Sequence, residues 1–218
     1  LDRQPELDEE IGERPLRDNV KIRKAHLLTT AGYYHEADAL FRQIDTARLA
    51  DAQMVEWYMV RQKFLFDYNE YVSSAGFAVP DYDKIDYYQK QILESLPEGS
   101  YYSRHIGILS LIGAKHFREA GEMNMSLIAT LDKDSRDYAV QTYWQGQISE
   151  LQGNAYDAIH WWTESAICDI KGAIKDNASL STLATRLINP QDADRAFRYI
   201  RFSLDDATFY NAKLRKVQ

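Results

Sequence analysis

Apolar residues along this chain recur with the spacing of amphipathic helices, and short polar turns separate these segments in pairs. Ala120, Ala158 and Ala196 stand 38 residues apart, and each follows a polar turn and opens the apolar face of a second helix. Ala37 lies 83 residues before Ala120, which leaves room for one longer helical pair between them. A fixed period of this kind is typical of helical repeats. The pattern therefore predicts an all-α fold built from about five helical hairpins.

The hairpin boundaries follow from the turn signals. We expect hairpins over 18–45, 50–97, 100–131, 138–170 and from 177 to the C-terminus, with turns near Gly32, at 73–76, near Gly113, near Gly153 and at Asn189-Pro190. Residues 1–16 are expected to form a leader or a capping segment broken at Pro15, and 17–218 a single repeat domain. The last helix is expected to run from Asp192 to Gln218 without a glycine cap, so we expect the native protein to continue past Gln218.

Composition and charge exclude several classes of protein. The formal charge of −7 and the lack of a clustered basic face argue against nucleic-acid contact by this segment. No run of 18 apolar residues is present, and membrane attachment is expected through sequence beyond Gln218. The single cysteine, Cys168, lies in an apolar run and is expected to be a buried small hydrophobe.

Sequence signatures of catalysis are missing. His116 and Glu119 are one turn apart, but there is no HExxH pair, phosphate-binding glycine loop, nucleophile elbow or CxxC pair. The pair Asp205-Asp206 fits a solvated helix face better than an acid–base dyad. The sequence therefore predicts no enzyme, no cofactor and no metal site.

The hairpin around Gly153 has a recognisable set of small residues. Gly146 and Ala158 would let its two helices approach closely, Gly153 would form the turn, and Trp162 would fill the large apolar position. This hairpin resembles a tetratricopeptide repeat, although the third hairpin has Lys115 where the turn glycine belongs and the period exceeds the family's 34 residues. The resemblance implies a right-handed superhelical array of tetratricopeptide-like hairpins.

The same resemblance implies a binding face. In tetratricopeptide arrays the first helix of each hairpin lines a concave groove, and the family's groove positions fall here on Ile22, His26, Tyr58, Gln62, His105, Leu109, Tyr143, Gln147, Ser181 and Thr185. Their aromatic and amide groups suit a peptide or protein ligand, with a small molecule or a glycan as alternatives. The competing interpretation is that these residues only pack between hairpins.

Aromatic doublets occur at Tyr33-Tyr34, Tyr87-Tyr88, Tyr101-Tyr102 and Trp161-Trp162. Neighbours on a helix point about 100° apart, so each doublet is expected to place one ring in the core and one near the surface. We expect Trp162 to be buried and Trp161 to be the more exposed ring.

A second resemblance covers the chain from about Lys21 onward. The segments 165–171, 179–184 and 194–215 are similar to a Bacteroidetes family of transmembrane transcriptional regulators, in which a tetratricopeptide-like region outside the membrane precedes a membrane helix. The resemblance implies a non-catalytic periplasmic sensor domain that binds through the groove and signals through its C-terminal helix. The alternatives are a constitutive protein–protein scaffold, for which a cytoplasmic location stays open, and a glycan-binding component.

Overall fold

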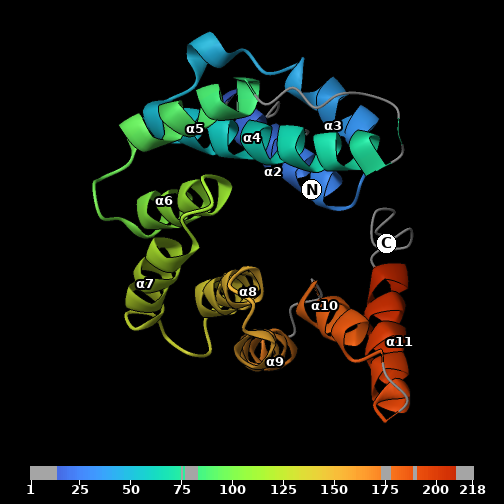
Figure 1. Ribbon diagram of the computed structural model, residues 1–218. Helices are drawn as coiled ribbons and strands as arrows, with labels where there is room; N and C mark the ends of the chain where they lie inside the picture. Colours follow the sequence, from blue (N-terminus) through green and yellow to red (C-terminus); the bar gives the residue numbers. More distant parts are fainter. Residues whose placement is uncertain (1–13, 75, 77–82, 173–177, 189–190, 210–218) are drawn as a thin grey trace. The chain divides into compact units, whose positions relative to one another are not determined.

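The computed structural model describes residues 14–74, 76, 83–172, 178–188 and 191–209 (Figure 1). Every regular element in this part of the chain is helical. The chain divides between Leu96 and Pro97 into two compact units, which we call unit 1 and unit 2. The expectation of one repeat domain over 17–218 stays a prediction.

Unit 1 contains two helical hairpins. Helices α2 (Arg14–Thr30) and α3 (Tyr34–Phe41) form the first, and the longer α4 (Asp51–Ser74) and α5 (Asp83–Ser95) form the second, with a short 3₁₀ turn, η1 (Thr46–Arg48), between the pairs. Pro15 lies in the first turn of α2, where a proline removes no intrahelical hydrogen bond. The rest of the expected leader lies outside the described residues.

Unit 2 contains three hairpins. They are α6 (Tyr101–Gly113) with α7 (Phe117–Ile128), α8 (Arg136–Leu151) with α9 (Ala155–Lys171), and α10 (Ala178–Arg186) with α11 (Ala193–Phe209). The first helices α8 and α10 also pack against the preceding second helices α7 and α9. The fold is therefore a helical repeat array, as predicted. The described part of α11 ends at Phe209, and the expected extension to Gln218 lies outside the described residues, as does the turn at Asn189-Pro190.

Three of the hairpin turns share one backbone conformation. Gly32 and Gly153 have φ of +80°, and Lys115 has φ of +62°. In the third turn Lys115 N–H donates to the Ile112 carbonyl at 2.9 Å and the next residue donates to the Leu111 carbonyl at 2.8 Å, and the glycine turns repeat this pattern. The third turn therefore centres on Lys115, not on Gly113, which is the last residue of α6.

The small residues that define the period lie at the helix contacts. Ala37, Ala120 and Ala158 are fully buried, and Ala196 is nearly so. In unit 1, Ala37 belongs to a core of aliphatic and aromatic residues that includes Ile22, Phe41 and Phe64. The core of unit 2 is more polar, because α8 buries Gln141, Thr142, Gln145 and Ser149. Asn124 of α7 satisfies part of this polarity by donating to the Gln141 carbonyl at 2.9 Å and to Gln145 Oε1 at 3.0 Å.

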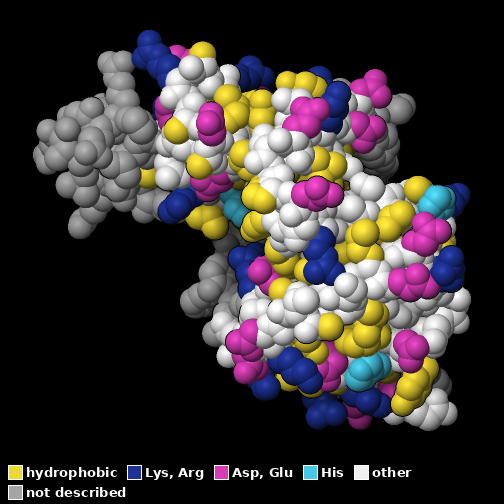
Figure 2. Space-filling view, turned by 90° about the vertical axis from the view of Figure 1, so that its left-hand side faces the viewer, with side chains coloured by type: hydrophobic (Ala, Val, Ile, Leu, Met, Phe, Trp, Pro, Cys, Tyr) yellow, Lys and Arg dark blue, Asp and Glu magenta, His cyan; other side chains and the backbone are white. Residues whose placement is uncertain are grey.

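The surface carries charges of both signs. On the face drawn in Figure 2, acidic and basic side chains are interspersed with hydrophobic ones. Among the helices that the structure describes, none has the length and apolar character of a membrane span.

Candidate ligand-binding face on the first helices

In unit 2 the first helices α6 and α8 are joined by a hydrogen-bonded group of three side chains. The Gln141 amide nitrogen lies 2.8 Å from the Tyr101 hydroxyl oxygen and 2.9 Å from Nδ1 of His105. The rings of Tyr101 and His105 are parallel, with centroids 6.1 Å apart. Gln141 is fully buried, whereas both rings retain some exposed surface. The buried amide therefore fixes the orientation of two rings at the surface of the unit.

Burial sets the protonation of this group. It lowers the pKa of His105, and the hydrogen bond to Gln141 only partly opposes this effect. Burial likewise raises the pKa of Tyr101. At neutral pH the pair therefore consists of a neutral imidazole and a neutral phenol, which recognise a ligand by hydrogen bonds and ring contact rather than by charge.

The predicted residues of α8 form a second bonded pair. The Gln147 amide nitrogen donates to the Tyr143 hydroxyl at 3.0 Å, one helical turn away. The Tyr143 ring also packs against a core cluster that includes Leu180 and Leu183 of α10. Both side chains remain partly exposed. Tyr143 is therefore held from both sides, and its hydroxyl has a fixed position.

The remaining predicted residues of unit 2 lie on α6 and α10. Leu109 and Ser181 are partly buried, and Thr185 is exposed with its hydroxyl donating to the Thr182 carbonyl at 2.7 Å. An ion pair of 2.9 Å between Arg186 Nη2 of α10 and Glu150 Oε1 of α8 spans the same two helices. This pair was not among the predicted residues, although it lies directly after Thr185.

In unit 1 the predicted residues have different environments. Ile22 is fully buried in the core beside Ala25 and Phe41, so it presents no surface to a ligand in this structure. The periodicity of α2 places it on the face that packs inside the unit rather than on the face left open. His26, one turn later, is partly exposed.

Tyr58 of α4 belongs to an aromatic cluster with Trp57, Tyr87 and Tyr88. The Tyr88 ring centroid lies 5.5 Å from that of Trp57 and 5.9 Å from that of Tyr58, and Tyr87 lies 5.3 Å from Tyr88. Burial and the adjoining Tyr87 hydroxyl raise the pKa of Tyr58. Tyr87 is 54% exposed. The cluster therefore presents tyrosine rings and hydroxyls on the surface of unit 1.

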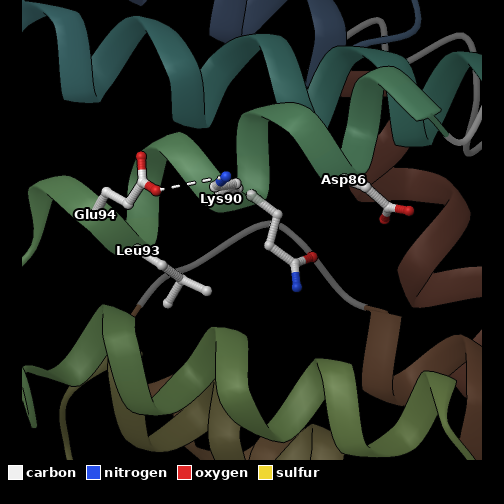
Figure 3. A pocket seen from close by; sticks show the side chains of 5 residues that line it. Asp86, Lys90, Leu93 and Glu94 are labelled. Atoms are coloured by element: carbon white, nitrogen blue, oxygen red, sulfur yellow. Dashed lines mark ion pairs between the residues drawn. The ribbon is translucent and has the colours of Figure 1, made fainter.

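The other predicted residue of α4, Gln62, continues this surface. Its amide nitrogen donates to Gln89 Oε1 of α5 at 3.4 Å. Gln89 in turn lines an open depression along α5, together with Asp86, Lys90, Leu93 and Glu94 (Figure 3). Lys90 Nζ lies 3.8 Å from Glu94 Oε1 in this depression. Three of its five lining residues are charged, and the depression is too open to enclose a ligand by itself.

Comparison with known proteins gives the family. The family model described as the SusR N-terminal TPR domain matches residues 1–218. The chain belongs to the SusR N-terminal TPR domain family. Comparison with curated proteins and with solved structures gave no match.

Within this SusR N-terminal TPR domain, the structure groups the predicted residues by unit. It brings His105 next to α8 and pairs Tyr143 with Gln147 in unit 2, and it places Tyr58 and Gln62 along α4 in unit 1. Whether these residues bind a ligand stays a prediction.

The sequence analysis did not assign any residue of a second helix to the candidate binding face. Tyr87, Tyr88 and Gln89 lie on α5, and the tetratricopeptide pattern assigns the groove to first helices only. The available signals were the unusual length of the second hairpin and the doublet Tyr87-Tyr88.

Two sequence motifs have structural explanations in this domain. The stretches Asn124-Met-Ser and Asn177-Ala-Ser match the short pattern of a glycosylation acceptor. Asn124 is fully buried and hydrogen-bonded to α8, so it is not an accessible acceptor, and Asn177 lies outside the described residues. Nδ1 of the exposed His116 lies 3.4 Å from Oε2 of Glu119, and no metal-binding group of three occurs among the described side chains.

Proposed function

We propose that this chain is the non-catalytic sensor domain of a membrane-bound transcriptional regulator, with its binding face on the first helices. The main support is a group of partly exposed side chains on α6 and α8 that hydrogen bonds hold in fixed orientations. His105 and Tyr101 are oriented by the buried Gln141, and the Tyr143 hydroxyl is fixed by Gln147. Preorganised rings and polar groups of this kind lower the entropy cost of binding a peptide or protein.

The signalling part of the proposal assigns the output to α11. Helical repeats flex by small rotations between hairpins, so a ligand that bridges α6, α8 and α10 would change how α10 and α11 pack. The family's resemblance to transmembrane regulators supports a periplasmic location, with attachment to the membrane through sequence beyond this segment. Under this proposal the domain contributes no catalytic group.

A glycan is a second candidate ligand, and the observation that favours it lies in unit 1. Sugar rings stack on flat aromatic surfaces and hydrogen-bond to hydroxyl and amide groups. The exposed Tyr87 beside Tyr58, with the Gln62–Gln89 pair one turn away, offers both kinds of group. A constitutive scaffold, which would bind a fixed partner without transmitting a change, is the remaining alternative.

The binding face is tested by crosslinking capture from envelope and cytosolic fractions of the source cells. Native chain is compared with Tyr143→Ala and Tyr58→Ala, which probe units 2 and 1 separately. The matched control is Tyr156→Ala, because Tyr156 is 84% exposed on the second helix α9. A partner retained by the native chain and the control but lost with Tyr143→Ala supports the proposal. Equal recovery by all four folded proteins would contradict it.

The signalling part needs a separate measurement. Once a partner is captured, hydrogen exchange of α11 amides is compared with and without it at saturation. Altered exchange in α11 supports the sensor, whereas exchange that changes only in α6 and α8 would indicate a scaffold.

A further inference from the structure

Helix α11 carries an exposed apolar stripe beside its buried face. Phe197, Ile200 and Leu204 are spaced three and four residues apart and are 66%, 42% and 47% exposed. The buried side of the helix is formed by Ala196 and the partly buried Tyr199. An apolar face with this helical spacing normally packs against another element.

The 38-residue period shows what covers the equivalent positions in the first hairpin of unit 2. The positions two periods before Phe197, Ile200 and Leu204 are Gly121, Asn124 and Ile128 of α7. All three are buried against α8: a Cβ atom on Gly121 would contact Ile148, Asn124 bonds to Gln141 and Gln145, and Ile128 clusters with Tyr138 and Ala139.

The second hairpin of unit 2 repeats this arrangement. Subtracting the period once places the stripe on Ile159, Trp162 and Ala166 of α9, which form one cluster with Leu180 and Leu183 of α10. Ser165 of the same face lies 2.6 Å from Ser179 of α10, measured between their hydroxyl oxygens. In both earlier hairpins, therefore, a following helix covers this face, and on α11 no described helix does so.

The sequence of α11 fits a second copy of itself as the covering helix. Phe197 and Leu204 lie three and four residues on either side of Ile200, so an antiparallel copy would place Phe197 against Leu204 and bring the two Ile200 side chains together. A two-fold pair of this kind makes each contact twice.

The charges beside the stripe are compatible with such a pair. Arg198, Arg201 and Asp205 are exposed along one flank. In the antiparallel arrangement Arg198 lies within about two residues, or roughly 3 Å along the axis, of Asp205 of the second copy. Helix α11 has three arginines and three aspartates, so it is formally neutral, whereas the whole chain has a formal charge of −7. Self-association through α11 thus avoids the repulsion that other faces of an acidic protein would meet.

We propose that α11 binds α11 of a second copy of this chain in an antiparallel two-fold pair centred on Phe197, Ile200 and Leu204. The proposal does not depend on the ligand-binding face, because it rests on a different surface. A single helix pair buries less surface than a typical stable interface, so the dimer is expected to be weak, with a dissociation constant on the order of micromolar.

Sedimentation equilibrium of the full chain, over about 1 to 200 μM to bracket such a dissociation constant, is the first test. The native protein is expected to dimerise and Leu204→Glu to stay monomeric with an unchanged helical circular dichroism spectrum. The matched control is Ile167→Glu, because Ile167 is 45% exposed on α9 but is not equivalent to a stripe position. A native protein that is monomeric throughout, or a Leu204→Glu variant that dimerises like the native protein, would overturn the proposal and indicate that another helix covers the stripe.

Cysteine crosslinking provides a second test that does not rely on a charged substitution. The native Cys168 is buried, so an introduced cysteine reports its own surroundings. Ile200→Cys is expected to form a disulfide-linked dimer on mild oxidation, because the two-fold axis passes close to this residue. Tyr156→Cys is the control, at a position of α9 that is 84% exposed. Equal crosslinking of both variants would reflect random collision and would count against the α11 pair.

Discussion

Gly146 of α8 lies directly against the indole ring of Trp162 of α9. A Cβ atom at position 146 would overlap Cδ1 and Nε1 of the ring and lie 2.9 Å from Cε2. Trp162 is fully buried, so its ring has no free space into which it could turn. The close packing of this hairpin therefore depends on the missing side chain at Gly146.

Gly146→Ala is expected to lower the free energy of unfolding by about 1 to 3 kcal/mol, the usual cost of overpacking a well-packed core. The opposing effect, a gain of up to about 1 kcal/mol in helix propensity, is smaller. Urea unfolding followed by circular dichroism measures the difference.

Gly113→Ala is the matched control for helix propensity, because a Cβ atom at this position of α6 has no neighbour within 4 Å. It is expected to be neutral or slightly stabilising. Combining Gly146→Ala with Trp162→Leu, which removes the contacting indole ring, should cost less than the sum of the two single substitutions. Additive costs would mean that the ring is not the source of the strain.

This contact was predictable from the sequence, because small residues at Gly146 and Ala158 opposite the large Trp162 form a pattern tied to the repeat period. The expectation that Trp162 is buried and Trp161 more exposed is confirmed. The division of the chain beside Pro97 was not predictable. Each hairpin carries the same kind of apolar pattern, and this pattern does not determine how extensively one hairpin packs against the next.

Lys115 adopts the left-handed conformation that glycine provides in the equivalent turns at Gly32 and Gly153. A residue with a Cβ atom is strained there by roughly 1 kcal/mol. Lys115→Gly is therefore expected to raise the free energy of unfolding by about 0.5 to 1 kcal/mol, after allowance for the greater entropy of glycine in the unfolded chain. Thermal and urea unfolding measure the gain.

The reverse substitution supplies the control. Gly153→Lys introduces the same strain into a turn that now lacks it, and a Cβ atom there meets no neighbour within 4 Å. It is expected to destabilise the protein by a similar amount. If Lys115→Gly lowered stability instead, the lysine side chain would have a stabilising contact that outweighs its backbone strain.

The ligand-facing residues were less predictable than the fold. The tetratricopeptide pattern assigned Ile22 to the groove, yet α2 packs that side chain into the core of unit 1. The same pattern could not anticipate Gln141, which holds His105 from a buried position on the neighbouring helix. Periodicity gives the face of a helix, but a hydrogen bond between two helices depends on their spacing and rotation, which no single segment encodes.

His105 gives the stability of the protein a pH dependence of known sign. Burial lowers its pKa in the folded chain below the ordinary value of 6.5. The unfolded chain therefore binds more protons between these two values, and stability falls as the pH decreases below about 6.5 toward the lowered pKa. The dependence fades over about one pH unit above 6.5, as the unfolded chain loses this proton. One histidine changes the free energy of unfolding by at most about 1.4 kcal/mol per pH unit.

His105→Gln removes this titrating group while keeping a polar side chain near Gln141. The difference between native and variant unfolding free energies is expected to shrink as the pH is lowered from 7 to 5, an interval chosen to span the ordinary histidine pKa. If the difference in unfolding free energy between the native protein and His105→Gln were constant across this interval, His105 would titrate no differently in the folded and unfolded chains.

Cys168 should be protected from thiol reagents in the folded protein. Its side chain is buried, its Sγ lies 3.3 Å from the Ser135 carbonyl, and burial raises the pKa of the thiol. Both effects reduce the accessible thiolate, which is the reactive form. Labelling by a chromogenic disulfide reagent at pH 8 is therefore expected to be at least about 100-fold slower than in urea, limited by opening of the unit.

The same labelling rate tests whether α11 stabilises the α8–α9 hairpin. Cys168 lies near the end of α9, on a cluster that includes Tyr138 and Ala139 of α8, so its labelling reports opening of the α8–α9 hairpin. Gly146→Ala, which strains this hairpin, should accelerate labelling in proportion to its loss of stability, whereas Leu204→Glu on α11 should leave the rate near the native value. Acceleration by Leu204→Glu alone would show that the exposed stripe of α11 stabilises the unit to which Cys168 belongs, and that its side chains are more than a docking surface.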